Sequence, residues 1–296
     1  MATPESAGNA IAARAEGLSA GFAQSLADVM RRADAALRPV LRDAIEGNRA
    51  ATVRAARAIQ LRRAIRQALT DAGYDDFVAA ASESAMEAMV AEVMRTRLAR
   101  GAAKLVRPSA ARLQALATLT ETNLLGTAED VTTALVRAVS QFAFTATPVD
   151  EILTSLAEVT TASLSQVQTL FDTQTSILGR QVEALATERL GPDQAFLYTG
   201  PVDGRTREWC LQRVGKVYTR REIEQMDNGQ LPNAFVTGGG YNCRHSFIAV
   251  ASDELVSLAG MNVRAPGFDD EIASARAQRA QARRSDRARR GRAVSN

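Results

Sequence analysis

The stretch PVDEILTSLAEVTTASLSQVQTLFDTQTSILGRQVEALATERL, residues 148–190, decides the fold of the N-terminal part of this chain. After its first residue it contains no proline and only one glycine, Gly179, so little in it forces a helix to end. Thr147 can cap a helix at this point, and proline suits the first helical position. Apolar residues then recur near the helical period: Ile152, Leu156, Val159, Leu164, Val167, Leu170, Leu178, Val182 and Leu185. We therefore predict one long helix over residues 148–190.

The sequence before this stretch is also helical in character. From about Ala10 onward it is rich in alanine, leucine and arginine, which are strong helix formers. Thr127, followed by Asp130, predicts the start of the helix that precedes the long one. Gly73 and Gly101 predict helix ends. Helix boundaries or kinks are expected at Pro39, Pro108 and Pro148.

Composition agrees with layers of helices. Hydrophobic residues make up 46% of the chain, but aromatic residues only 5%, which favours thin helix packing over a bulky core. The predicted fold class is mainly α, with a helical scaffold over residues 1–190. A small α+β domain over residues 191–266 and an arginine-rich tail over residues 267–296 follow it.

The long helix has an unusual polar face. Between Val159 and Gly179 its one charged residue is Asp172, and Ser, Thr and Gln occupy the other polar positions. An uncharged face of this length is more easily buried than a charged one. Two alternatives remain open: the helix packs within its own bundle, or residues 159–178 contact neighbouring chains such as a portal.

The composition changes abruptly at Gly191. The segment QAFLYTG, residues 194–200, has strand-like residues, and HSFIAVA, residues 245–251, predicts a closing strand. Thr206 can cap a short helix that carries Trp209 and Cys210. Thr219 and Glu222 form a capping box for a helix that ends at Asn228-Gly229. About 60 residues make a marginal domain, which often needs a staple or a partner.

The final segment is strongly basic. Eight arginines fall between Arg276 and Arg292 with one acidic residue, Asp286, among them. We expect a solvated, disordered or fraying helix that contacts DNA without reading its sequence, because clustered charges release counterions and no aromatic residue is present for stacking. The predicted DNA contacts are Arg276, Arg279, Arg283, Arg284, Arg287, Arg289, Arg290 and Arg292.

The chain's one histidine and two cysteines suggest a site. Cys210, Cys243 and His245 have the donor atoms that zinc prefers, with Asp203 as a possible fourth ligand. A Cys210–Cys243 disulfide and simple packing of two buried thiols are the alternatives. Catalysis by Cys243 and His245 would need an orienting acid that the sequence does not place, so we expect no enzyme. No cofactor is predicted, with zinc left open.

The N-terminus does not have the layout of a secretion signal, and no segment reaches the ~18 apolar residues of a membrane helix. Two cysteines suit synthesis in a reducing compartment. We expect a chain that is made in the cytoplasm and contacts no membrane when it is made.

The C-terminal domain carries an ordered set of motifs. An aromatic strand is followed by Asp203, Arg205 and Thr206, by Cys210, by Gly215-Lys216-Val217, and by a glycine-rich turn with Asn242, Cys243, Arg244 and His245. This order resembles the C-terminal domain of phage minor head proteins, the head-morphogenesis family related to the Mu F protein. The resemblance covers about residues 195–250. Many members of that family carry two further thiols, which are absent here.

The resemblance implies a structural virion protein at the portal vertex or inside the capsid, acting in head assembly and in DNA packaging or ejection. The implied partners are the portal protein, other capsid proteins and packaged double-stranded DNA, with several copies per particle and host cytoplasm as the place of assembly. Asp203, Arg205, Thr206 and Arg244 are expected to hold the domain together, the charged residues among them as a network. The alternatives are an enzyme or toxin-like domain that uses Cys243 and His245, and a free nucleic-acid-binding protein.

Overall fold

The structure is a computed structural model, and it describes residues 3–49, 55–99, 107–142, 148–250 and 268–293. Long helices dominate it: α1 (Pro4–Arg49), α2 (Ala55–Asp71), α3 (Tyr74–Ala99), α4 (Ala110–Phe142) and α5 (Val149–Ala186). A small antiparallel sheet follows, with β1 (Ala195–Thr199), β2 (Val217–Thr219) and β3 (Ser246–Ala249). Short helices α6 (Glu208–Leu211), α7 (Arg220–Glu224) and α8 (Ala234–Thr237) connect the strands, and α10 (Phe268–Ala293) comes last. The prediction of a mainly α fold with a small α+β part is confirmed.

The chain forms two compact units. The first combines Met1–Glu16, Ala88–Ala110 and Ser176–Asn296, and the second combines Gly17–Glu87 and Ala111–Thr175. The division predicted from the sequence at residues 190 and 266 stays a prediction.

The second unit is a helical core held by aromatic stacking. The rings of Phe22 and Phe171 lie parallel with their centroids 3.7 Å apart, and Phe77 tilts against Phe22 at 4.9 Å. Gln168 donates to the hydroxyl of Ser19 at 2.9 Å. Residues of the predicted uncharged face of α5 therefore pack inside the chain, which favours the first of the two alternatives for that helix.

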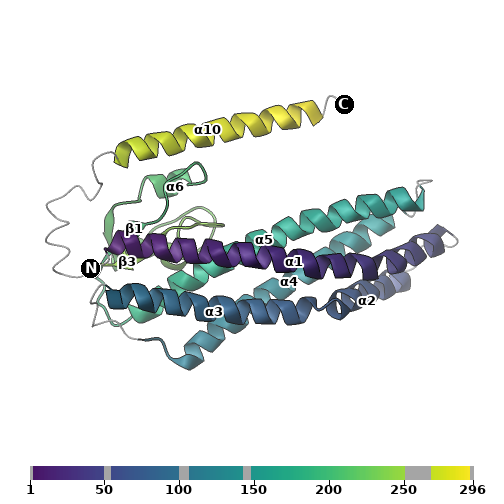
Figure 1. The fold of residues 1–296 in the computed structure, drawn as a ribbon, viewed down its shortest axis with the longest axis horizontal. Helices are drawn as coiled ribbons and strands as arrows, with labels where there is room; N and C mark the ends of the chain where they lie inside the picture. Colours follow the sequence, from purple (N-terminus) through teal and green to yellow (C-terminus); the bar gives the residue numbers. More distant parts are fainter. Residues whose placement is uncertain (1–2, 50–54, 100–106, 143–147, 251–267, 294–296) are drawn as a thin grey trace. The chain divides into compact units, whose positions relative to one another are not determined.

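The first unit contains the sheet, in the order β2-β1-β3. In the register, Leu197 of β1 pairs with Val217 on one side and with Ile248 on the other. Figure 1 shows β1 and β3 next to the first turns of α1, where the Thr199 hydroxyl donates to the carbonyl of Glu5 at 3.5 Å. A buried core forms on this sheet from Phe196, Tyr198, Cys210, Leu211, Val214, Ile223, Phe235, Cys243, Phe247, Ala249, Ile272 and Ala275.

Helix boundaries follow local sequence signals in most places. The long helix begins at Val149 with two acidic residues in its first turn and ends at Ala186, close to the predicted limits. Gly73 separates α2 from α3 with a φ of 83°, as a glycine after a helix end does. The Thr219 hydroxyl accepts from the backbone N–H of Glu222, and the Glu222 carboxylate accepts from the Thr219 N–H, so the capping box of α7 is confirmed.

Three local predictions are wrong or fall elsewhere. Thr127 does not start a helix, because its hydroxyl bonds to Leu124 and Tyr74 inside an unbroken α4. Thr206 does not cap α6, since its hydroxyl donates to the Pro201 carbonyl at 2.9 Å and closes the preceding turn. Helix α7 ends at Glu224, before the predicted Asn228-Gly229. Gly101 lies outside the described residues.

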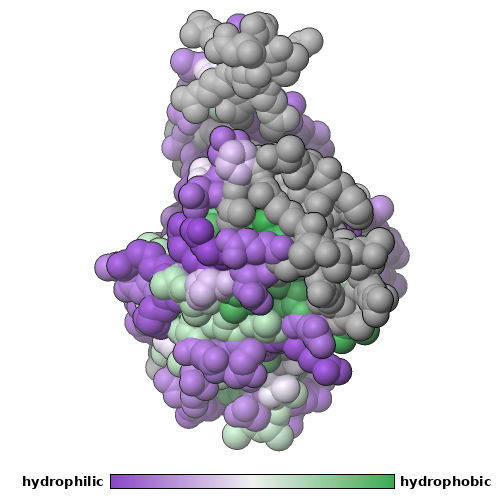
Figure 2. All heavy atoms as spheres, turned by 90° about the vertical axis from the view of Figure 1, so that its right-hand side faces the viewer, coloured by the Kyte–Doolittle hydropathy of each residue, from purple (hydrophilic) through white to green (hydrophobic). Residues whose placement is uncertain are grey.

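The described surface is mostly polar in the view of Figure 2, where hydrophilic residues predominate and hydrophobic ones show between them. Within the ranges that the structure covers, the exposed large apolar side chains are Ile59, Leu119 and Tyr241. None of the described helices combines the length and the apolar character that spanning a membrane requires.

Candidate functional site

The predicted site residues Cys210, Cys243 and His245 meet beside Tyr198 in a buried cluster, the corner, of the first unit. Cys210 lies on α6, and Cys243 and His245 lie on the turn that enters β3. Tyr198, on the central strand β1, points its hydroxyl at both sulfurs, at 3.3 Å from Cys210 Sγ and 3.5 Å from Cys243 Sγ. All four side chains are buried.

Both cysteines are free, and their Sγ atoms are 3.8 Å apart. The hydrogen bond between them lowers the pKa of Cys243 well below its ordinary value, and the same contact raises the pKa of Cys210. Burial opposes this lowering of the Cys243 pKa, whereas the side chain of His245 and the positive charge of Arg180 add to it. The backbone N–H of Gly239 also donates to Cys243 Sγ, at 3.0 Å. Burial also raises the pKa of Tyr198 well above its usual range, so its hydroxyl keeps its proton and can donate.

His245 is enclosed by the same elements. Its ring stacks on Tyr198 with the centroids 5.4 Å apart, and the side chain is 2% exposed. Gly200 lies against the ring, because a Cβ at that position would come within 2.9 Å of the imidazole Cδ2. Among the described residues, Nε2 of His245 has no hydrogen-bond partner although it is buried.

The three glycines before Cys243 shape this corner. Gly238 and Gly240 adopt φ values of 57° and 95°, a backbone conformation that glycine reaches more easily than other residues. A Cβ on Gly239 would overlap Cys210 Sγ and would also lie 3.3 Å from the ring of Trp209. The turn therefore wraps the two sulfurs closely, and glycine is needed at its centre for space.

Sequence reasoning missed Arg180, which supports the corner from α5. It is 2% exposed, and its guanidinium donates to the carbonyls of Val236 at 2.6 Å, Cys243 at 2.9 Å and His245 at 2.9 Å. A guanidinium stays charged when it is buried, so these carbonyls act as its solvation shell. The sequence shows only that Arg180 lies between Leu178 and Val182, two positions that the structure buries. An exposed arginine would give the same pattern, so its burial could not be predicted.

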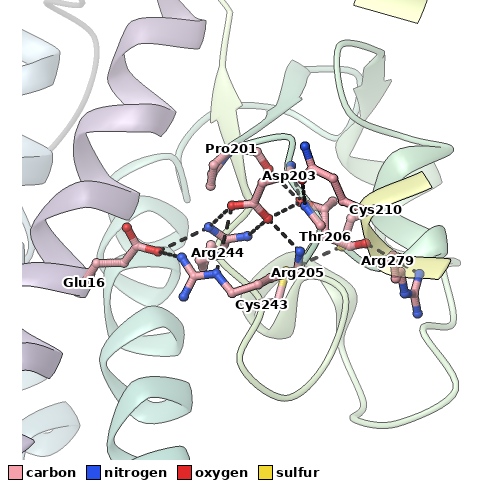
Figure 3. A network of polar contacts seen from close by, with 11 residues as sticks. Glu16, Pro201, Asp203, Arg205, Thr206, Cys210, Cys243, Arg244 and Arg279 are labelled. Atoms are coloured by element: carbon pink, nitrogen blue, oxygen red, sulfur yellow. Dashed lines mark hydrogen bonds and ion pairs between the residues drawn. The ribbon is translucent and has the colours of Figure 1, made fainter. Parts of the chain in front are cut away.

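The charged network lies at the edge of the corner (Figure 3). Arg244 binds the carboxylate of Asp203 with two hydrogen bonds of 2.5 and 2.8 Å, and Asp203 also accepts from the backbone N–H of Arg205 at 2.9 Å. The carboxylate of Glu16, on α1, accepts hydrogen bonds from the guanidinium groups of Arg205 at 2.7 Å and Arg244 at 3.2 Å. Burial alone would raise the pKa of Asp203, but the bonds from Arg244 outweigh it and lower the pKa to about 2.

Asp203 is therefore unavailable as a metal ligand, so the possible fourth ligand named from the sequence does not belong to the cluster. Its carboxylate is engaged by Arg244, and it does not belong to the cluster of donor atoms. Within the described chain, that cluster consists of Cys210, Cys243 and His245, whose donor atoms all lie within 4.8 Å of one another.

The arginine-rich tail forms a helix, which was one of the predicted alternatives, and its first turns pack on the domain instead of being solvated. Residues Phe268–Ala293 form α10, and its Ile272 and Ala275 are buried in the core on the sheet. Arg276 pairs with Glu208 at 2.5 Å, and Gln278 accepts from the backbone N–H of Gly204 at 3.0 Å. The first turns of α10 are therefore an anchor, because their apolar residues complete the small core.

The predicted DNA contacts thus fall into separate groups. Arg276 and Arg279 bind within the chain, the latter to the carbonyl of Thr206 at 3.5 Å. Arg283 and Arg284 are exposed beyond the anchor. Four further arginines lie on α10, but the structure does not describe their side chains: Arg287, Arg289, Arg290 and Arg292.

Comparison with known protein-family models finds no match to this chain, and searches of curated proteins and of solved structures find none either.

Proposed function

We propose that this chain is a minor head protein of a bacteriophage, a structural and non-enzymatic component of the virion that touches packaged DNA without reading its sequence. Its place is the capsid interior or the portal vertex, and its partners are the portal protein, other capsid proteins and double-stranded DNA. The resemblance of residues 195–250 to the head-morphogenesis family supports this role.

One observation carries the DNA part of the proposal. Helix α10 is fixed to the domain through Ile272 and Ala275, and it continues past this anchor with Arg283 and Arg284 exposed. A rigid helix holds such charges along a line, where they neutralise phosphates and release counterions. The anchor keeps the basic segment at a fixed place on the domain.

The burial of the corner supports a structural role over an enzymatic one. Cys243 is 4% exposed and His245 is 2% exposed, so a substrate cannot reach them without local opening. The pocket beside α10 is lined by Leu211, Gln212, Lys216, Asp269, Ile272 and Arg276, and it includes neither residue.

Salt-dependent binding to duplex DNA tests the proposal. Each arginine that neutralises a phosphate adds about 0.9 to the slope of log affinity against log salt, so R283Q/R284Q should reduce the slope by about 1.8. R31Q/R38Q is the matched control, since it removes the same charge from exposed arginines of α1 that pair with Asp28 and Asp34. An equal loss in both variants would contradict the role of α10.

Purified particles test the location. We expect the chain there at a fixed copy number, with binding to unrelated DNA sequences of equal strength. Absence from particles together with tight DNA binding would support a free nucleic-acid-binding protein. A turnover that H245A abolishes would support an enzyme.

A further inference from the structure

The corner around His245 has the geometry of a four-ligand metal site. The two sulfurs are 3.8 Å apart, and Tyr198 Oη lies 3.3 Å from Cys210 Sγ and 3.5 Å from Cys243 Sγ. An imidazole nitrogen of His245 lies within 4.8 Å of both sulfurs.

These distances match a tetrahedron around zinc. With Zn–S at about 2.3 Å and tetrahedral angles, two thiolate sulfurs are about 3.8 Å apart. With Zn–O at about 2.1 Å, an oxygen and a sulfur are about 3.6 Å apart, close to the 3.3 and 3.5 Å found here. Two hydrogen-bonded thiols would give similar distances, so a metal site has to be argued from a further observation.

The imidazole provides the independent observation. His245 is buried, and its Nε2 has no hydrogen-bond partner in the described chain. A buried polar nitrogen without a partner is costly, and most such groups in proteins are satisfied. Coordination of a metal ion by the imidazole would remove this cost, beside two thiols whose thiolate forms are the preferred zinc donors.

The surrounding structure holds the ligands in place. The Gly239 N–H donates to Cys243 Sγ at 3.0 Å, a bond that orients a metal-bound thiolate. Arg180 fixes the carbonyls of both Cys243 and His245 at 2.9 Å, so the turn that carries these two ligands is set by α5. Its positive charge also favours a site with two thiolates.

We propose that a zinc ion binds in this corner, held by Cys210, Cys243 and His245, with the hydroxyl oxygen of Tyr198 at the fourth position. Binding releases the protons of the two thiols to solvent, so two thiolates balance the charge of the ion. The ion joins α6, β1 and the turn before β3, and it staples a small domain. This role does not depend on the proposed place in the virion.

The metal content of the purified full-length chain tests the site. The chain is prepared under reducing conditions with zinc present, dialysed, and assayed for zinc by elemental analysis, with one ion per chain expected. Replacement of zinc by cobalt should give the visible bands of a tetrahedral thiolate site in the wild-type chain, so this readout does not require a variant to fold.

Variants then assign the ligands. C243S and H245A should lose at least nine-tenths of the bound metal, and Y198F should keep the cobalt spectrum in a shifted form with at least tenfold weaker binding. Y74F is the matched control, because Tyr74 is also buried and hydrogen-bonded, to Thr127, and it should bind metal as the wild type does.

Two results would overturn the proposal. One is a reduced wild-type chain that neither contains zinc nor takes up zinc or cobalt when they are added. The other is a purified chain whose mass is lower by two hydrogens, which would show that Cys210 and Cys243 form a disulfide in place of a metal site. Unchanged cobalt bands in Y198F would remove Tyr198 from the ligand set.

Discussion

Replacing Arg180 by methionine tests how the corner is held. The substitution keeps a long apolar stem but removes donors from the carbonyls of Val236, Cys243 and His245. A buried carbonyl left without a partner costs about 1–3 kcal/mol. We take the lower end of this range, about 1 kcal/mol, for each of the three carbonyls, because the substitution also removes a buried charge. The Nη2 atom of this guanidinium has no hydrogen-bond partner in the described chain. R180M should therefore lower the free energy of unfolding by about 3 kcal/mol.

Urea unfolding followed by tryptophan fluorescence measures this change. Trp209 is the one tryptophan of the chain, and it lies in the same unit as Arg180. For a unit of this size, a loss of about 3 kcal/mol lowers the Tm by about 6–12 °C. R189M is the matched control, since Arg189 is exposed and its replacement should stay within about 0.5 kcal/mol. A stability of R180M equal to that of R189M would refute the supporting role of Arg180.

Three other perturbations probe the same unit. G239A forces a Cβ into Cys210 Sγ and should cost about 1–3 kcal/mol in urea unfolding, whereas G191A, with no atom near its Cβ, should be neutral; equal effects would contradict the close wrapping of the sulfurs. The folded pKa of Asp203, about 2, lies below its ordinary 3.8, so its stabilisation is present above pH 4 and is lost as the pH falls toward 2. Discounted for partial exposure, D203N should cost about 1 kcal/mol at pH 7 and much less at pH 2, where about half of the Asp203 carboxylates are protonated; an equal cost at pH 7 and pH 2 would rule out this linkage. I272A should cost about 2–4 kcal/mol and make α10 sensitive to proteolysis, and α10 that stays protected would argue against the anchor.

The residues of the candidate metal site could be predicted only in part from the sequence. Cys210, Cys243 and His245 were identified as candidate ligands from residue type alone, and the structure brings their donor atoms together. Asp203 was considered only as a possible fourth donor, beside its expected place in a charged network with Arg205 and Arg244. Its actual partner is Arg244, 41 residues away, and that pairing removes it from the cluster.

Periodic and local signals were sufficient for the helices. The apolar period of α5, the glycine after α2 and the capping box of α7 each depend on residues within a few positions, so the sequence by itself determined them. The same local reasoning failed at Thr127, because its hydroxyl bonds inside a longer helix.

Contacts between distant segments were decided by the tertiary structure alone. Tyr198 meets two cysteines from different elements, Arg180 of α5 binds the turn before β3, and Ile272 of the basic tail completes the core on the sheet. The residues of each pair are far apart in the sequence, so the periodicity of a helix or a strand does not predict that they meet. Their partners are set by how the elements pack, because burial leaves each polar group with only the neighbours that the fold supplies.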